Sequence, residues 1–330
     1  MIKLQFSDIW NASLNTVDRE PVQRDYTWAS EMGKPIIDRY LSMKAVPPTN
    51  SPNTRSRRKF YAGNVWEFVA GLVLYQLGVI IPQQQEVWVD DTPIRVKGKL
   101  DYLIGGIPNY DFARDQIKAF PFQKEMTDRF MKTIDLFEER IGGKELHPLV
   151  YEIKSCSQYV IDMIGEGGNI IGHDLQIYHY LRGLKMDEGH ICYISKDDAL
   201  LEERVIKNPD LDLKQKYESD LITLKKYLDA DEMPPKEPLI LFENGRLKKS
   251  FGIEYSSYLT MIYGYKEPKE YSDAITGKIS AWNRVLKRLA DGAKITDKNK
   301  VRIEEMEKEG YNPYALAKVA KIEEEEIVVD

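Results

Sequence analysis

The sequence places an acid and a base on one face of a short apolar strand. Glu152 and Lys154 flank Ile153 in a stretch that follows Leu149 to Tyr151. Alternate residues of a strand point to the same side, so Glu152 and Lys154 share a face. Such a carboxylate can hold a divalent cation, and the ammonium beside it can stabilise charge on a phosphate or orient a water molecule. The alternative is a local ion pair without catalytic meaning.

A second carboxylate lies inside another apolar strand. Asp101 follows Leu100 and precedes Tyr102 to Ile104. Burying an unpaired carboxylate costs free energy unless it is hydrogen-bonded, paired or bound to a cation. If the strands of Asp101 and Glu152 are neighbours, the two carboxylates require a metal ion or a shared proton. The plainer alternative is that Asp101 only ends its strand.

Two further segments carry polar side chains that suit the same chemistry. Glu67 lies in a strongly predicted helix over 64–77, where it is either a third metal ligand or an exposed acid beside the apolar face. Gln176 and Tyr180 are one helical turn apart, so they share a face. Such a pair can hydrogen-bond phosphate oxygens and stack on a base, although ordinary amphipathic helices often contain one.

The spacing of apolar residues predicts the elements that must position these side chains. Helical spacing before residue 200 indicates helices near 34–43, 64–77, 125–141 and 174–184. Alternation predicts a hairpin of 86–89 with 94–104 and strands at 149–155 and 190–195. Later segments are mostly helical, at 212–229, 276–290, 299–309 and 313–320. This order predicts one α/β core with a helical C-terminal region.

Composition excludes several classes of protein. The 330 residues include 2 Cys, too few for a disulfide scaffold, a four-cysteine metal site or an iron–sulfur cluster. This cysteine usage fits a reducing compartment, and we expect a cytoplasmic protein. The longest nearly uncharged apolar stretch, Phe68 to Ile81, is 14 residues long and too short to span a membrane. The N-terminus lacks the layout of a signal peptide.

The net charge at first points away from nucleic acid. With 47 Lys and Arg against 53 Asp and Glu the chain carries −6, which argues against coating DNA by bulk charge. Seven of these acids are Glu67, Asp101, Glu152 and the run Glu323–Glu326, and without them the balance is +1. The charge therefore permits a local basic path.

A basic cluster precedes the Glu67 helix. It consists of Arg55, Arg57, Arg58 and Lys59 and is a candidate for phosphate contacts, with a solvated loop as the alternative. His173, one turn before Gln176, is a further candidate to approach the site. No ATP is expected, because the Gly165–Gly168 loop lacks the Gly-Lys-Ser/Thr ending of a nucleotide-binding loop.

The order of these features resembles the PD-(D/E)XK nuclease superfamily, in particular its RecB-like and lambda-type exonuclease branch. That branch includes phage and CRISPR-associated exonucleases. The family order is a helical Glu, then Gly98-x-x-Asp101, then Glu152-x-Lys154 on a strand, then Gln176-x-x-x-Tyr180 on a helix, and the resemblance covers about residues 24–200. It implies a restriction-endonuclease-like α/β core with a central mixed sheet flanked by helices.

The resemblance also implies a role for each matching position. Asp101, Glu152 and Lys154 would be catalytic, with Lys154 positioning the water and stabilising the charge of the phosphorane. One or two Mg²⁺ or Mn²⁺ ions would support in-line hydrolysis. Their ligands would be Glu67, Asp101, Glu152 and the Ile153 carbonyl. Gln176 and Tyr180 would contact DNA, together with His173 and the basic cluster.

Three departures from the family pattern affect the expected organisation. Many RecB-like members have a His where this chain has Glu67, and 252–264, placed like a cluster-binding segment, contains no Cys, so no iron–sulfur cluster is expected. The segment 105–147 is an insertion, either a lid, DNA guide or partner surface, or a helix packed on the edge of the core. We expect a nuclease core over 1–210 and a mostly helical region over 211–330 packed on it.

These features predict a divalent-metal-dependent deoxyribonuclease, more consistent with an exonuclease than with site-specific cleavage. Its role would be DNA processing, repair or recombination, with DNA and a recombination protein as partners and no membrane contact. The alternatives are a catalytically inactive nuclease-like module that binds DNA or protein, a structure-specific endonuclease, and an unrelated α/β protein with coincidental motifs.

Overall fold

The structure is a computed structural model that describes residues 14, 20–81, 85–243 and 245–327. The chain forms two compact units, one of 1–46 with 52–232 and one of 47–51 with 233–330. The first unit combines mixed sheets with helices, so the predicted α/β class is confirmed. It ends later than the expected residue 210, because α8 (Leu211–Ala230) packs against α2 (Ile36–Met43) and α7 (Ile171–Leu184).

A five-stranded sheet forms the centre of the first unit. Its strand order is β2 (Ile80–Ile81), β5 (Tyr102–Gly106), β6 (Leu146–Cys156), β7 (Glu188–Ser195) and β8 (Leu201–Lys207). β6 and β7 are parallel and the other neighbours antiparallel, so the sheet is mixed. Parallel neighbours need a crossover connection. Here α6 (Gln158–Gly165), which we did not predict, and α7 provide it.

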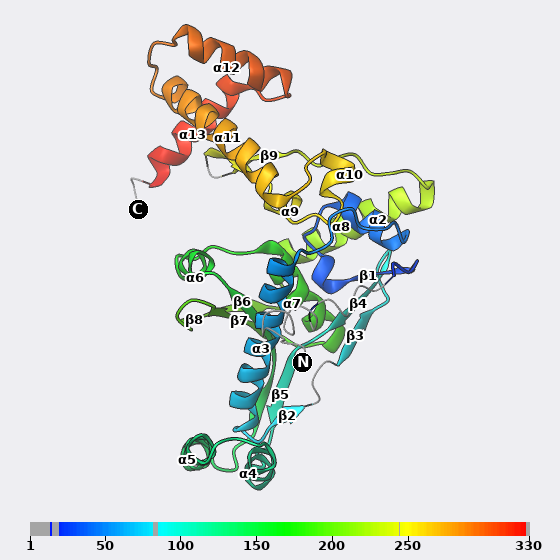
Figure 1. The fold of residues 1–330 in the computed structure, drawn as a ribbon, viewed down its shortest axis with the longest axis vertical. Helices are drawn as coiled ribbons and strands as arrows, with labels where there is room; N and C mark the ends of the chain where they lie inside the picture. The colour runs from blue at the N-terminus through cyan, green and yellow to red at the C-terminus, as the bar shows by residue number, and fades with distance from the viewer. Residues whose placement is uncertain (1–13, 15–19, 82–84, 244, 328–330) are drawn as a thin grey trace, which may run out of the picture. The chain divides into compact units, whose positions relative to one another are not determined.

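Two helices cover opposite faces of this sheet. Side chains alternate along β6, so Glu152 points to the face that carries α7, and Tyr151 and its partner Tyr102 point to the other face. Figure 1 shows α3 (Thr54–Tyr75) crossing in front of the sheet on that second face. A Cβ at Gly71 would lie 2.3 Å from the Tyr102 hydroxyl oxygen, so glycine is needed for this close approach.

Helix α3 differs from its prediction in length. It begins at Thr54 rather than near residue 64, because the side chain of Asn53 caps it by accepting a hydrogen bond from Ser56 N (2.9 Å). The basic cluster of 55–59 therefore lies in the first turns of a helix and not in a loop.

The buried face of α3 also differs from the prediction. Leu72 is buried, but Phe68 is 51% exposed, and Val65, Val69 and Val73 are exposed as well. The helix packs on the sheet through small residues: a Cβ at Gly63 would touch Ser155 Oγ at 3.2 Å, as Gly71 meets Tyr102. Periodicity alone could not reveal this, because it shows which residues share a face and not which face meets a partner.

A smaller sheet carries the segment that leads to Asp101. The predicted hairpin is confirmed as β3 (Glu86–Val89) and β4 (Arg95–Lys99), and β1 (Tyr26–Trp28) pairs with β4 in parallel. The prediction of one strand over 94–104 is wrong. Leu100 N donates to Gln85 O (3.2 Å), whereas Asp101 bonds to β6. The chain therefore changes sheets between β4 and β5, and Asp101 lies at the junction.

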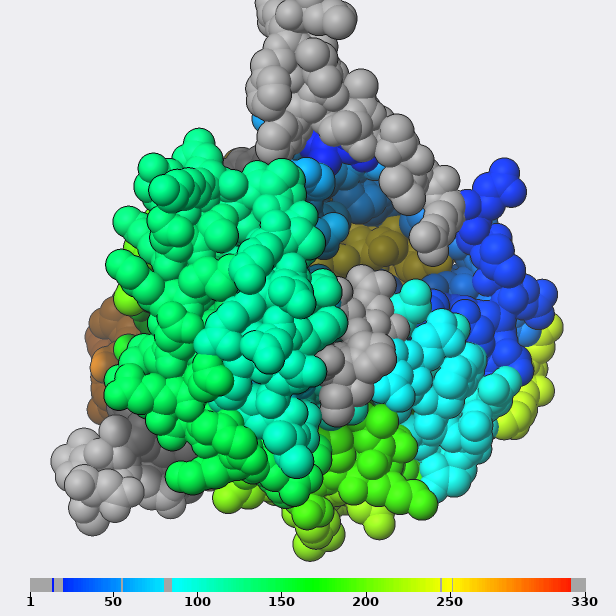
Figure 2. Space-filling model, turned by 90° about the horizontal axis from the view of Figure 1, so that it is seen from below, coloured from blue at the N-terminus to red at the C-terminus, as the bar shows by residue number. Residues whose placement is uncertain are grey.

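The insertion forms a helical hairpin. α4 (Tyr110–Ala119) was not predicted, and α5 (Lys124–Ile141) matches the predicted helix. The two helices bury a small core of their own around Tyr110, Ile117 and Ile134. In Figure 2 the turquoise and green residues that include this hairpin form much of the visible surface on one side. The insertion is thus a packed element with its own core rather than an irregular loop.

The second unit is mostly helical. Its helices are α9 (Phe251–Glu254), α10 (Leu259–Tyr263), α11 (Pro268–Ala290), α12 (Asp297–Lys308) and α13 (Pro313–Ile327). The hairpin of β9 (Ile240–Glu243) with β10 (Arg246–Lys249) was missed. The core of the second unit contains Trp282, Tyr271 and Met306. Across the described residues, no helix combines the length and apolar character needed to cross a bilayer.

His179 on α7 links the smaller sheet of the first unit to α8. It is fully buried, its Nε2 lies 3.1 Å from Val87 O, and its Nδ1 lies 2.9 Å from the Tyr217 hydroxyl. A carbonyl only accepts, so Nε2 carries the proton and Tyr217 donates to Nδ1. Burial lowers the pKa of His179 from 6.5 to about 4. The folded protein therefore holds this imidazole neutral.

We expect the stability of the first unit to fall as the pH is lowered, because of His179. Between the unfolded pKa of 6.5 and the folded pKa of about 4, the unfolded chain binds more protons. The contribution of His179 to the free energy of unfolding therefore rises with pH through this window, by about 3 kcal/mol. Urea unfolding at both ends of the window measures the change. His179→Gln should reduce the change in the free energy of unfolding by about this amount, whereas the exposed control His147→Gln should leave it unchanged; equal curves for the wild type and both variants would contradict the expectation.

Candidate active site

The predicted acid–base pair meets the polar face of α7. Lys154 Nζ donates hydrogen bonds to Glu152 Oε1 (2.5 Å) and to Gln176 Oε1 (3.0 Å). Gln176 Nε2 donates to Glu152 Oε1 (2.8 Å) and to the Tyr180 hydroxyl oxygen (2.9 Å). Tyr180 in turn donates to the carbonyl of Lys99 (2.7 Å). In this arrangement Gln176 binds both the acid and the base, and Tyr180 binds Gln176. The DNA contact of Gln176 and Tyr180 stays a prediction.

Asp101 lies directly beside this network. β5 and β6 are antiparallel neighbours, and their register places Tyr102 opposite Tyr151, so Asp101 comes opposite Glu152. Asp101 Oδ2 accepts a hydrogen bond from Ile153 N (2.8 Å). The condition that the two strands be neighbours is thus met, and Asp101 has a specific partner at the end of its strand.

The carboxyl group of Glu152 is buried, and one of its oxygens lacks a hydrogen-bond partner among the described residues. Its side chain is 3% exposed, and Oε2 is a buried oxygen without a hydrogen-bond partner in the described part of the chain. Burial raises the pKa of Glu152 to about 8, against the opposing effect of Lys154. An oxygen left in this state fits a further ligand, either a proton or a cation.

The charges of Asp101 and Lys154 depend on each other. Burial raises the pKa of Asp101, and the Lys154 ammonium opposes that rise. Burial alone would lower the pKa of Lys154, but the carboxylates of Glu152 and Asp101 outweigh it and the pKa is raised. Lys154 is therefore held as an ammonium ion next to two carboxylates, which suits it to stabilise negative charge rather than to accept a proton.

Glu67 lies near this pair but on the other helix. The hydroxyl of Tyr102 donates to the Glu67 backbone carbonyl (2.8 Å), which fixes this turn of α3 above β5. Partial burial and the charge of Asp101 raise the pKa of the Glu67 carboxyl. The charges of Asp101 and Lys154 therefore affect the Glu67 carboxyl, and among the described residues no hydrogen bond orients it.

The predicted three-carboxylate cluster is not assembled. Among the described residues, no three His, Cys, Asp or Glu side chains are grouped so that they could hold a metal ion. Mg²⁺ in phosphate-processing sites often uses only one or two carboxylates, with waters and substrate phosphates completing its shell. The partnerless Oε2 of Glu152 and the neighbouring Asp101 fit that smaller set. Glu67 and the Ile153 carbonyl as ligands stay predictions.

His173 has a protein partner. Its Nδ1 lies 3.1 Å from the Tyr193 hydroxyl, and the two rings pack together with centroids 5.8 Å apart. Burial, followed by the charge of Lys154, lowers the pKa of His173 to about 3. The imidazole is neutral at neutral pH and offers no positive charge to a phosphate. Its role as a DNA contact stays a prediction.

The basic cluster divides into two parts. Arg57 donates to the carbonyls of Pro52 (3.0 Å) and Leu14 (3.3 Å), so it holds backbone. Arg58 and Lys59 are exposed on α3, and the side chain of Arg55 lies outside the described residues. Sequence reasoning missed Lys196, whose pKa is lowered by burial and then by nearby Lys59. The sequence signal for Lys196 was its position directly after the predicted strand 190–195. The ends of neighbouring parallel strands lie at the same edge of a sheet, so residues that follow them lie close together.

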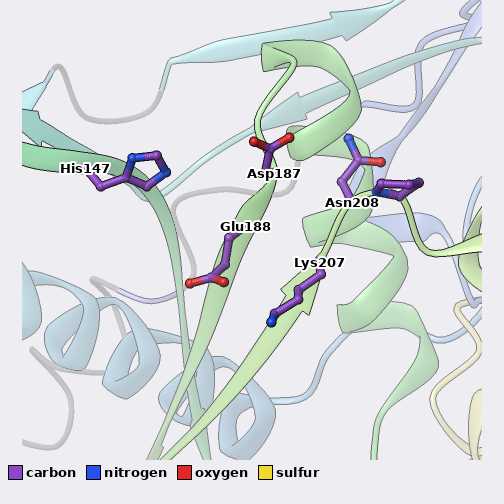
Figure 3. Close-up of a pocket in the computed structure, with 6 residues that line it drawn as sticks. His147, Asp187, Glu188, Lys207 and Asn208 are labelled. Atoms are coloured by element: carbon purple, nitrogen blue, oxygen red, sulfur yellow. The ribbon is translucent and has the colours of Figure 1, made fainter.

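A separate pocket lies at the other end of the parallel strands. It has a volume of about 390 Å³ and is lined by His147, Asp187, Glu188, Lys207, Asn208 and Pro209, as Figure 3 shows. Asn208 N and its side chain bond to the carbonyls of Asp187 (2.7 Å) and Met186 (3.1 Å). Because His147 lies at the start of β6 and Glu152 lies in its second half, this pocket is distinct from the candidate site.

Comparisons with known proteins give only distant likenesses. No protein-family model matches the sequence, and no curated protein matches it. The crystal structure of SSO0001 is similar over 78% of this chain and 95% of that one, at 12% identity and a TM-score of 0.43. An alkaline exonuclease (LHK-Exo) from Laribacter hongkongensis is similar over 68% and 97%, at 11% identity and a TM-score of 0.31. The complex of LHK-Exo with dAMP is similar over 62% of this chain and 95% of that one, at 12% identity and a TM-score of 0.31. Likenesses this weak do not place the chain in a family.

Proposed function

We propose that the protein is a divalent-metal-dependent deoxyribonuclease of the PD-(D/E)XK type, with exonuclease action the favoured mode. One observation supports this most: the Asp101 and Glu152 carboxylates, which the register places opposite each other, and the Lys154 ammonium lie together, with Glu152 Oε2 buried and partnerless within the described residues. Two carboxylates beside a held ammonium suit phosphodiester hydrolysis better than a structural ion pair, which would leave no oxygen unsatisfied.

The chain's own residues have separable tasks in this proposal. A Mg²⁺ or Mn²⁺ ion bound by Asp101 and Glu152 would neutralise phosphate charge and favour formation of the attacking hydroxide. Lys154 stabilises the negative charge that grows on the phosphoryl oxygens, and its hydrogen bond to Gln176 keeps Nζ in place. Tyr180 holds Gln176 through its hydroxyl oxygen. DNA processing, repair or recombination, with DNA and a recombination protein as partners, is the setting that we infer.

A second candidate follows from the ion pair itself. Lys154 already neutralises Glu152 Oε1 without a metal ion, as it would in a nuclease-like module that binds DNA or protein without cutting it. Calorimetric titration with Mn²⁺ separates the two: a heat of binding that disappears in Asp101→Ala supports the enzyme.

End-labelled linear DNA and closed circular DNA, incubated with Mg²⁺ or Mn²⁺, test the function. An exonuclease shortens the linear DNA and leaves the closed circle intact. Cleavage of the circle would instead support a structure-specific or general endonuclease. If both DNAs stay intact with either metal, the enzyme proposal fails and the binding module remains.

A further inference from the structure

The second unit contains a strongly basic segment in an acidic chain. Residues 284–302 include seven Lys and Arg against two Asp, whereas the whole chain carries −6. The segment covers the end of α11, the turn that follows it and the first half of α12. Figure 1 shows these two helices joined by that short turn. The positive charge is therefore concentrated in one supersecondary element.

The packing of α11 determines where three of these side chains point. Trp282, Val285 and Leu286 are buried in the core of the second unit. Arg284, Lys287 and Arg288 fall on the opposite side of the helix, three and four residues apart, and all three are exposed. The core thus holds three cations on one outward face.

Two more exposed cations lie at the turn. Lys294 is in the connection between the helices, and Lys298 is in the first turn of α12. The glutamates of α12 lie in its later turns, at Glu304, Glu305 and Glu307. We call the set of Arg284, Lys287, Arg288, Lys294 and Lys298 the α11–α12 basic surface.

These five cations lack acidic partners. In the part of the chain that the structure describes, none of them lies in an ion pair; Arg284 donates only to the backbone carbonyl of Ser280 (3.1 Å). Other cations of the same unit are paired, such as Lys249 with Glu254 and Lys278 with Glu309. Gathering uncompensated like charges opposes folding through their repulsion. A polyanion bound there would remove that repulsion.

We infer that the α11–α12 basic surface binds the phosphate backbone of duplex DNA without reading its sequence. The choice of DNA as the polyanion rests on the proposed function. The existence of the basic surface is independent of that function, because it follows only from the exposed cations of α11, α12 and the turn between them. The segment 284–302 that carries this surface contains no Phe, Tyr or Trp, the side chains that would stack on unpaired bases or enter a lipid interface. Lys and Arg on a rigid helix instead suit contacts to phosphates.

Fluorescence anisotropy of a labelled blunt duplex, titrated with the full chain in EDTA at several salt concentrations, tests the inference. The variant is Arg284→Gln with Lys287→Gln and Arg288→Gln. Its affinity should fall roughly ten- to hundredfold at low salt, and the slope of log K against log salt should become shallower by about 2 to 3, for up to three lost phosphate contacts. The matched control, Lys214→Gln with Lys216→Gln and Lys226→Gln, removes the same charge from exposed positions of α8 and should bind as the wild type does.

Several results would overturn the inference. The first is a failure of the wild type to bind the duplex at low salt, and the second is a triple variant that keeps the affinity and the salt slope of the wild type. The third such result is a control variant that loses as much affinity as the triple variant. Binding to phosphatidylserine vesicles in place of DNA would also overturn it. No metal is present, so the result is separate from cleavage: a protein that cuts DNA but keeps its affinity in the triple variant loses this inference alone. Loss of binding in the variant supports the inference even if no DNA is cut.

Discussion

Lys154→Ala is expected to lower the rate of DNA hydrolysis by about 10²- to 10³-fold, the usual loss when a preorganised group that stabilises transition-state charge is removed. Lys154 Nζ is held by Glu152 and Gln176, so its position is fixed before substrate arrives. Its pKa is raised despite burial by the carboxylates of Glu152 and Asp101, so it remains charged at the pH of the assay. Single-turnover cleavage of end-labelled linear DNA measures the effect.

The control and a second measurement separate catalysis from metal binding. Lys207→Ala removes an exposed lysine at the far end of β8 and should cleave as the wild type does. Lys154→Ala should still give a Mn²⁺ binding signal in calorimetry, whereas Asp101→Ala should give none. Full activity in Lys154→Ala would remove this residue from the site. Loss of Mn²⁺ binding in Lys154→Ala would show that it maintains the site rather than acting on the substrate.

Arg204→Ala is expected to destabilise the first unit by about 3 kcal/mol, because it leaves a buried carboxylate without its cation. Asp174 is 1% exposed, and Arg204 binds it through Nε and Nη2, both at 3.0 Å. Asn169 also donates to Asp174 (3.1 Å), and Asp174 lies in the first turn of α7, where the helix dipole favours negative charge. These two effects keep the loss at the lower end of the range for buried pairs.

Chemical denaturation followed by circular dichroism measures this change. The control is Lys225→Ala, which breaks the ion pair with Asp229 on α8, where both side chains are largely exposed, and should cost less than about 1 kcal/mol. Adding Asp174→Asn to Arg204→Ala should recover part of the stability, since the uncompensated charge is then gone. A loss from Arg204→Ala no larger than that of the control would show that Asp174 does not depend on its arginine.

Much of the local structure of the first unit could be predicted from residue types. The hairpin of 86–89, the helix of 125–141 and the strand around Glu152 follow from alternation or helical spacing, and all three occur. The pairing of Gln176 with Tyr180 on one helix face also follows from spacing alone. These predictions succeed because each depends on contacts between near neighbours in the chain.

Other features escaped prediction because distant parts of the chain decide them. The outward-facing apolar residues of α3, such as Phe68, are exposed because Gly71 lets the helix lie against Tyr102 on its other side. The strand of 94–104 divides because Asp101 finds a hydrogen-bond donor on β6. α8 joins the first unit because its Tyr217 reaches His179 on α7.

By itself the sequence determined which side chains can do the chemistry: an acid and a base on one strand, a second acid ahead of it, and an amide and a phenol on one helix. Side-chain alternation and helical periodicity are properties of the backbone, so these relations hold wherever the elements pack. Only the tertiary structure decided that Asp101 comes opposite Glu152 and that Glu152 Oε2 is buried without a partner within the described residues. It also decided that Glu67, Asp101 and Glu152 do not form a group of three metal ligands there. Burial and pairing between separate elements depend on how whole surfaces pack, and no local pattern encodes that.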